Sequence, residues 1–296
     1  MNFRQLHYIC TVADHCNISK AAKALMISQP SLSNFIAKTE KTLGVRLFER
    51  SASAPLKLTY AGERFVAHAR KILMQSNSML REMSDISGSI AGRIVLGFPH
   101  ERLSYMAPAI LPKYKQLYPQ IELKFETANG TALLDHLQTG QIDIAVLPHC
   151  KGNAVLETVD LFEETLYLIT GGHGLPDEYL SDSVNRKLEP AKLGDLDFIL
   201  LHEGHVMRIF MDEYFESLGI EPKVILETSS NLASYKLAAS GLGATVVPQT
   251  TVALAREEPN ACICDFAKWT VRAFYRKTAY FGEPERNLIE VMKEAF

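Results

Sequence analysis

A short polar segment around residue 30 carries side chains suited to hydrogen bonds with nucleic-acid bases. Ser28 can cap a helix, and Gln29-Pro30 places proline in a first turn, where no intrahelical donor is lost. Short polar residues at the start of such a helix suit base edges, and lysines one or two turns later suit phosphates. The segment therefore predicts a DNA-contacting helix; the alternative is that Gln29 and Ser33 are surface residues of a packing helix.

Histidines and cysteines elsewhere could bind a metal or be oxidised. His202-x-x-His205 lacks an evident carboxylate or thiol partner, so we predict no metal. Cys262-x-Cys264 is spaced too closely for a usual zinc pair, and in a strand both thiols would lie on one face. A redox switch is an alternative to two thiols without a role. Five cysteines without a C-x-x-C spacing predict no disulfide framework.

Motifs of common enzyme classes are absent from the sequence. It contains no G-x-S-x-G, no G-x-x-x-x-G-K-[ST], no H-E-x-x-H and no dinucleotide-binding G-x-G-x-x-G after a strand. We therefore expect a protein that is not an enzyme and has no cofactor. No apolar run approaches ~18 residues and the N-terminus lacks an apolar signal core, which predicts a cytoplasmic protein without membrane contact.

Charge is distributed unevenly along the 296 residues. The chain has 31 Lys and Arg against 34 Asp and Glu, a net charge of −3. Residues 1–90 hold twelve basic and six acidic side chains, whereas the remainder holds 19 basic and 28 acidic ones. A basic first third joined to an acidic body predicts an anionic partner for the first part alone, because binding phosphates needs a local excess of Lys and Arg.

The first sixty residues predict three helices and a hairpin. Apolar residues at offsets of three and four predict a first helix that ends near residues 15–17. A second helix is expected to begin at Ser19 as its cap, and a third begins at Ser28. Residues 44–59 alternate around a turn-rich segment and predict a small hairpin. This order describes a helix-turn-helix with a wing, whose second helix enters the major groove.

Four motifs in this region resemble the winged helix-turn-helix of LysR-type transcriptional regulators. They are Ser19-x-x-Ala22, Ser28-Gln29-Pro30-Ser31-Leu32-Ser33, Leu43-Gly44-Val45-x-Leu47-Phe48-Glu49-Arg50 and Leu58-Thr59-x-Ala61-Gly62. The chain departs from the family at Asn34, where arginine is common, and in residues 51–54, where the wing is usually more basic. Gln29 and Ser33 are expected to reach base edges, whereas Lys38, Arg50 and Ser31 hold phosphates. The full predicted DNA-binding set is Ser28, Gln29, Pro30, Ser31, Ser33, Asn34, Lys38 and Arg50.

Residues 59–87 predict one long helix with an apolar seam. Phe65, Ile72, Met79 and Ile86 fall seven residues apart. The seam could pack on its own chain, but the resemblance favours a linker helix through which two copies form a homodimer. Such a dimer would present two recognition helices to the halves of an interrupted palindromic operator in double-stranded DNA. Residues 87–92 then break the helix.

Beyond residue 92 strands alternate with helices, which predicts a parallel sheet covered by helices. The expected strands are 93–98, 121–126, 143–148, 166–169, 198–201, 224–227, 244–247 and 271–275, and the expected helices are 104–118, 131–138, 206–218, 230–240 and 284–296.

This body resembles the LysR-type effector domain, which has the two-lobed architecture of periplasmic binding proteins (type 2). The motifs are Gly92-Arg93-Ile94-Val95-Leu96-Gly97, Pro108-x-x-Leu111-x-x-Tyr114-x-x-x-Tyr118-Pro119, Leu137-x-x-Gly140-x-Ile142-Asp143-Ile144-Ala145 and Ala238-Ala239-Ser240-Gly241-Leu242-Gly243-x-x-x-Val247-Pro248. The expected fold is thus α+β and α/β in three parts. They are a winged helix-turn-helix over 1–58, a linker helix over 59–87 and an effector-binding domain over 92–296, with lobe I at about 92–160 and 267–296 and lobe II at about 161–266.

In such folds a cleft lies where loops leave the carboxyl ends of strands and helix N-termini point inward. The predicted effector-binding residues are Pro99, His100, Glu101, Asn129, Gly130, Thr131, Pro148, His202, Glu203, Ser230 and Pro248. Anionic effectors are frequent in the family, yet Glu101 and Glu203 would repel a dicarboxylate or bind an amine. The alternative is that Glu101 pairs with cations outside the cleft.

The resemblance implies a sequence-specific transcriptional regulator controlled by a small-molecule effector bound between two lobes. It further implies pairing of effector domains into a homotetramer and contact with RNA polymerase. The alternative is a small-molecule binding protein whose N-terminal helices mediate only protein contacts.

Overall fold

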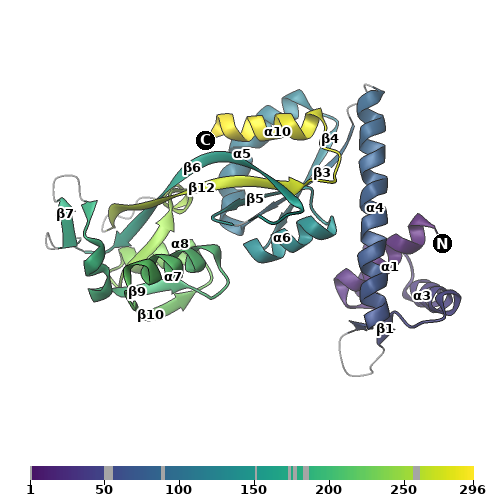
Figure 1. Cartoon of the computed structure of the whole chain (residues 1–296), viewed down its shortest axis with the longest axis horizontal. Helices are drawn as coiled ribbons and strands as arrows, with labels where there is room; N and C mark the ends of the chain where they lie inside the picture. The colour runs from purple at the N-terminus through teal and green to yellow at the C-terminus, as the bar shows by residue number, and fades with distance from the viewer. Residues whose placement is uncertain are drawn as a thin grey trace. The chain divides into compact units, whose positions relative to one another are not determined.

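The computed structural model describes residues 2–49, 56–87, 91–150, 152–172, 175, 179–182, 187–255 and 261–296. The chain divides into two compact units, Met1–Ser89 and Ile90–Phe296, which are described separately (Figure 1). The division falls inside the segment 87–92 that was expected to break the linker helix. Within the described residues, no helix combines the length and apolar character needed to span a bilayer.

Local capping groups set the ends of the three N-terminal helices, α1 (Phe3–His15), α2 (Ile18–Ala24) and α3 (Gln29–Leu43). The side chain of Asn2 caps α1. Ser28 caps α3 with Pro30 in the first turn, as the sequence predicted. The prediction for the second helix was wrong by two residues, because the side chain of Asn17, and not Ser19, accepts the Lys20 amide.

A two-stranded hairpin follows α3, with β1 (Phe48–Glu49) antiparallel to β2 (Lys57–Leu58). Glu40 on α3 accepts hydrogen bonds from the Leu47 and Phe48 amides at 2.8 and 3.2 Å, which ties the hairpin to the helix. The predicted phosphate contact Arg50 and the wing segment 51–55 lie outside the described residues.

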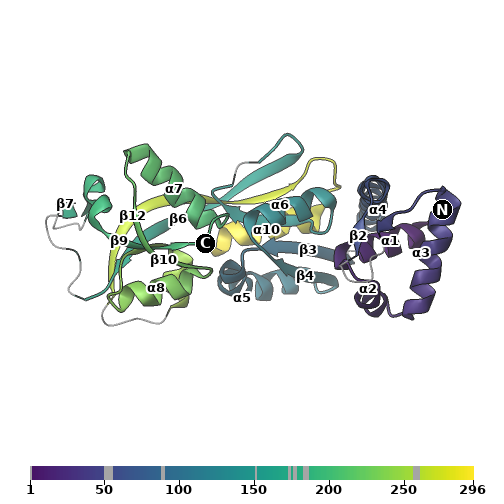
Figure 2. The same ribbon diagram turned by 90° about the horizontal axis from the view of Figure 1, so that it is seen from below.

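The long helix α4 (Tyr60–Ile86) packs against α1 and completes the core of the first unit (Figure 2). Val66 and Ala69 are buried in that core. Thr59 caps α4 through the Gly62 amide at 3.0 Å. A Cβ at Gly62 would lie 2.0 Å from the Leu47 carbonyl oxygen, so a glycine is needed where the helix starts against the hairpin.

The second unit is built on a six-stranded sheet in the order β11 (Thr245–Pro248), β6 (Leu156–Thr170), β12 (Cys262–Arg276), β5 (Ile144–Pro148), β3 (Gly92–Phe98) and β4 (Ile121–Thr127). Strand β3 pairs in parallel with β4 and β5, and β12 pairs antiparallel with β5 and β6. A second, parallel pair of strands, β9 and β10, is joined to the sheet by a bridge between Phe198 and Ala244.

The helices and strands of this unit have the following bounds. They are β3 (Gly92–Phe98), α5 (His100–Leu117), β4 (Ile121–Thr127), α6 (Gly130–Thr139), β5 (Ile144–Pro148), β6 (Leu156–Thr170), β7 (Leu180–Asp182), β8 (Lys187–Leu188), the 3-10 helix η2 (Pro190–Asp195), β9 (Asp197–Leu201), α7 (Val206–Leu218), β10 (Lys223–Thr228), α8 (Asn231–Ala239), β11 (Thr245–Pro248), α9 (Gln249–Leu254), β12 (Cys262–Arg276) and α10 (Glu283–Ala295).

Two long strands connect the lobes of this unit. Strands β6 and β12 each have 15 residues and run together from one lobe to the other, whereas the sequence predicted only short strands at 166–169 and 271–275 (Figure 1). The acidic residues of β6 obscured its pattern, and cross-strand cations compensate for them: Arg272 lies 2.6 Å from Asp160. The short elements β7, β8, η2 and α9 were not predicted.

Helices cover both faces of each lobe. In lobe I, side chains of α5 and α10 pack in the main core, and those of α6 form a separate cluster around Leu133 and Phe274. In lobe II, α7 packs in the main core and α8 on a cluster around Tyr235. Helix α5 begins at His100 instead of the predicted Ser104, so His100 and Glu101 occupy its first turn.

Candidate functional site

The exposed face of α3 carries the predicted base-contacting residues. Leu32, Ile36 and Thr39 are buried against the rest of the first unit. The opposite face consists of exposed Ser28, Gln29, Pro30, Ser31, Asn34 and Lys38, with Ser33 half-buried at its edge. The hydroxyls of Ser28 and Ser31 lie 2.7 Å apart and share a hydrogen bond, and Gln29, Asn34 and Lys38 present exposed polar side chains on the same face.

The predicted dimer seam separates into two parts along α4. Phe65 is half-buried and packs against the core of the first unit, together with Leu73. Ile72, Met79 and Ile86 are 44%, 54% and 72% exposed, and Leu80 and Met83 are exposed beside them. The apolar stripe that remains uncovered in a single chain is therefore Ile72, Met79, Leu80, Met83 and Ile86.

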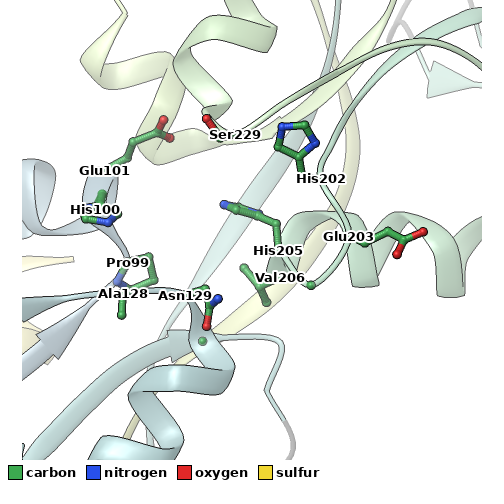
Figure 3. Close-up of a pocket in the computed structure, with 12 residues that line it drawn as sticks. Pro99, His100, Glu101, Ala128, Asn129, His202, Glu203, His205, Val206 and Ser229 are labelled. Carbon is green, nitrogen blue, oxygen red and sulfur yellow. The ribbon is translucent and has the colours of Figure 1, made fainter. Parts of the chain in front are cut away.

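A cavity of about 350 Å³ lies between the two lobes of the second unit (Figure 3). The side chains come from the ends of β3, β4, β9 and β10 and from the starts of the helices that follow. The lining residues are Pro99, His100, Glu101, Ala128, Asn129, Gly130, His202, Glu203, Gly204, His205, Val206 and Ser229. Its size suits a small metabolite.

Three helix N-termini that border this cavity are capped by their own side chains. Asn129 accepts from the Ala132 amide at 2.8 Å and caps α6. His205 caps α7 by accepting the Met207 amide on Nδ1 at 3.2 Å, and Ser230 caps α8 by accepting the Ala233 amide at 3.2 Å. Part of the anion-binding capacity of these termini is thus already used.

Glu101 reaches from lobe I to lobe II. Its Oε1 accepts from the Ser230 hydroxyl at 2.8 Å and from the Leu232 amide at 3.1 Å, and the Thr251 hydroxyl lies 3.5 Å from Oε2. These contacts exclude the alternative of a cation-paired Glu101 outside the cleft. The carboxylate sits at the start of α8, where the helix dipole favours negative charge.

Two of the histidines that line the cavity, His205 and His202, differ in their surroundings. Burial lowers the pKa of His205 below its ordinary value, although the negative charge of Glu101 opposes this shift. Its Nδ1 accepts an amide proton, so the neutral ring carries its hydrogen on Nε2. His202 is exposed, with Nδ1 3.5 Å from Glu227. No group of three metal-binding side chains occurs in the described part of the chain.

A smaller cavity of about 160 Å³ adjoins the first and shares Gly130, Gly204 and Val206 with it. Thr131 and Cys150 line this second cavity. Burial raises the pKa of the Cys150 thiol to about 11. The two cavities together form one region between the lobes.

The predicted effector residues divide into three groups. Pro99, His100, Glu101, Asn129, Gly130, His202 and Glu203 line the larger cavity, and Thr131 lines the smaller one. The hydroxyl of Ser230 is engaged with Glu101, and Pro148 and Pro248 are buried at strand ends; none of the three lines either cavity. The predicted effector-binding set did not include Ala128, Gly204, His205, Val206 and Ser229, which also line the larger cavity. All five follow predicted strands, and that position is the signal that could have indicated them.

A buried ion pair lies behind the cleft at the junction of the lobes. Arg102 and Glu164 are 4% and 2% exposed, and Arg102 Nη2 donates to Glu164 Oε2 at 2.6 Å. The indole of Trp269 donates to the same oxygen at 2.7 Å, and the Thr250 amide donates to Oε1 at 3.0 Å. Two neighbouring residues of α5 therefore bond to lobe II: Glu101 through Ser230 and Leu232, and Arg102 through Glu164.

Known proteins match both units. Residues 3–63 match the bacterial regulatory helix-turn-helix protein, lysR family, and residues 87–296 match the LysR substrate binding domain. A probable hydrogen peroxide-inducible genes activator of Streptomyces viridosporus is 31% identical over 250 residues, which cover 84% of this chain and 78% of the relative. The DNA-binding transcriptional dual regulator OxyR of Escherichia coli strain K12 is 29% identical over 302 residues, covering 100% of this chain and 94% of the relative.

A solved structure shares the architecture of the whole chain. Full-length OxyR from Pseudomonas aeruginosa, with a cysteine replaced by aspartate, has a TM-score of 0.74 and 28% identity, covering 100% of this chain and 94% of that chain. The relatives confirm the predicted fold class and the prediction of a regulator instead of an enzyme, and they disfavour N-terminal helices that mediate only protein contacts. The chain belongs to the LysR family: it is a DNA-binding transcriptional regulator with a C-terminal effector-binding domain.

Proposed function

We propose that a small molecule bound in the 350 Å³ cavity controls how this regulator occupies its operator. The observation that carries the proposal is the lining itself, to which both lobes contribute. A ligand that contacts both lobes can favour one lobe arrangement, whereas a ligand with equal affinity for two arrangements would shift neither population. We further propose that the protein acts in the cytoplasm, where it reaches chromosomal DNA and can contact RNA polymerase.

The exposed stripe on α4 supports a homodimer as the DNA-binding form. Ile72, Met79 and Ile86 are uncovered in the single chain, and a second copy of the same helix would remove them from water. Two copies of α3 would then read the halves of an interrupted palindrome. Pairing of effector domains into a homotetramer stays a prediction.

Substitutions on α3 test the assignment of its contacts. Operators are first isolated by enrichment of genomic fragments at physiological salt. We expect Gln29→Ala to cost ~1–3 kcal/mol on the operator and little on random DNA, because it removes a contact to a base edge. Lys38→Ala should weaken both and lower the salt slope by about one, because a phosphate contact releases a counterion. Titration at several salt concentrations measures both; equal losses on the two DNAs for Gln29→Ala would contradict a base contact.

Hydrogen peroxide is not the signal that this proposal favours, although some relatives are named as peroxide-inducible gene activators. The sequence has no cysteine between Cys150 and Cys262. Cys150 lines the smaller cavity, but its raised pKa of about 11 keeps it protonated at neutral pH, and the thiolate is the form that reacts with peroxide.

We therefore expect operator affinity to be the same before and after treatment with hydrogen peroxide at neutral pH. Titrations of the native protein and of Cys150→Ser, with and without peroxide, make the comparison. A reversible change that dithiothreitol restores and that Cys150→Ser abolishes would show that this thiol is a sensor after all. The same series with Cys262→Ser tests the close pair Cys262 and Cys264, whose sulfurs lie 3.9 Å apart.

A further inference from the structure

The charged groups around the larger cavity are all acidic or weakly basic. Glu101 and Glu203 line it, together with three histidines, and no lysine or arginine does so among the described residues. His205 contributes no positive charge at neutral pH, because burial disfavours its protonated form and its Nδ1 already accepts an amide proton. An anionic ligand would therefore enter without a permanently cationic partner.

Only one of the two carboxylates is directed toward the other lining side chains. Figure 3 shows the carboxylate of Glu203 pointing away from the group, whereas Glu101 extends from the first turn of α5 toward Ser229. The two residues therefore form a matched pair for experiment: both border the cavity, but only the carboxylate of Glu101 is directed toward the other lining side chains.

Glu101 keeps unused capacity to accept hydrogen bonds. Its Oε1 accepts two hydrogen bonds, from Ser230 and Leu232, while the contact from the Thr251 hydroxyl to Oε2, at 3.5 Å, is beyond the usual range for an O–H donor. A carboxylate has about four acceptor positions, and these three donors are neutral. The negative charge is held at the start of α8 by neutral donors and the helix dipole.

We propose that the cleft binds a small cationic effector bearing a primary amine, with Glu101 as the carboxylate that receives the ammonium group. This inference rests on the proposed effector role of the cavity. The apolar side chains of Pro99, Ala128 and Val206 contact the carbon skeleton of the ligand. Because Glu101 also bonds lobe II, the ligand stabilises the lobe arrangement in which that carboxylate reaches Ser230 and Leu232.

The test compares amines with carboxylates of matching carbon skeleton on the full-length native protein. Putrescine is paired with succinate, cadaverine with glutarate, and a wider panel of small primary amines with the corresponding acids. Thermal unfolding screens the panel, since a ligand that binds the folded state raises the midpoint. We expect stabilisation by members of the amine set alone, and isothermal titration then gives their affinities.

Matched variants assign the binding to one carboxylate. Glu101→Gln keeps the shape and an oxygen for Ser230 and Leu232 but removes the charge, so the best amine should bind at least ~10-fold more weakly. Glu203→Gln should bind it as the native protein does. Independently of any variant, acetylating every amino group of the best amine should abolish its binding to the native protein, because the resulting amides are neutral.

Each other outcome contradicts a distinct statement. Stabilisation by carboxylates instead of amines, or by neither, overturns the cationic effector, as does amine binding that Glu101→Gln leaves unchanged. Operator titrations with the same compounds test the proposed regulatory function separately from the proposal that the effector is an amine. If a carboxylate alters operator affinity, the cleft is regulatory but its effector is not an amine. If an amine binds through Glu101 but never alters operator affinity, the amine site is confirmed and its proposed role in regulation is wrong.

Discussion

Replacing Ile72 and Met79 together by aspartate is expected to dissociate the proposed homodimer and abolish operator binding. Both side chains are about half exposed in the single chain, so the substitutions leave the core of the first unit intact. In a dimer they would place four unpaired carboxylates in an apolar contact, where an unpaired charge is strongly unfavourable. We expect at least ~100-fold weaker association, since each tenfold corresponds to about 1.4 kcal/mol.

Analytical ultracentrifugation and operator titration measure this effect, and a charge-matched variant controls for it. Ala67→Asp with Asn77→Asp adds the same charge to α4 at exposed positions on the side of the helix away from the apolar stripe. That control should keep the native mass and affinity. An unchanged mass with retained operator binding for the Ile72 and Met79 variant would mean that α4 does not carry the dimer contact.

Arg102→Ala is expected to lower the free energy of unfolding of the second unit by ~3–5 kcal/mol, because it leaves the charge of Glu164 buried without its partner. The remaining donors to Glu164, from Trp269 and Thr250, are neutral and do not replace the guanidinium. Trp269 is the single tryptophan of the chain and donates directly to Glu164, so its fluorescence reports unfolding at this place.

Arg272→Ala provides the matched control for that measurement. Arg272 also pairs with a carboxylate across β6 and β12, at 2.6 Å from Asp160, but this pair is exposed. Exposed pairs contribute ~0–1 kcal/mol, so the urea midpoint should move little. Similar shifts for the two variants would show that the Arg102 pair is no more important to stability than a surface pair.

The sequence alone was sufficient for the features that depend on short-range interactions. Ser28 and Pro30 define the start of α3 because a cap and a first-turn proline act within one helical turn. The alternation beyond residue 92 predicted strands covered by helices but not the antiparallel pairing of β12, whereas the resemblance to LysR-type regulators implied the two-lobed body and the family, which the relatives confirm.

Several features depended on contacts between residues far apart in sequence. Glu101 bonds Ser230, 129 residues away, so no local pattern could show whether it faced the cleft or a surface cation. The charged half of β6 is a strand because it pairs antiparallel with β12 along its length, and this pairing places Arg272 beside Asp160. Thr131 and Asn129 both follow β4, yet only Asn129 borders the larger cavity. The direction of each strand-end side chain is decided when the two lobes pack together, because that packing determines which donors and acceptors come within hydrogen-bonding distance.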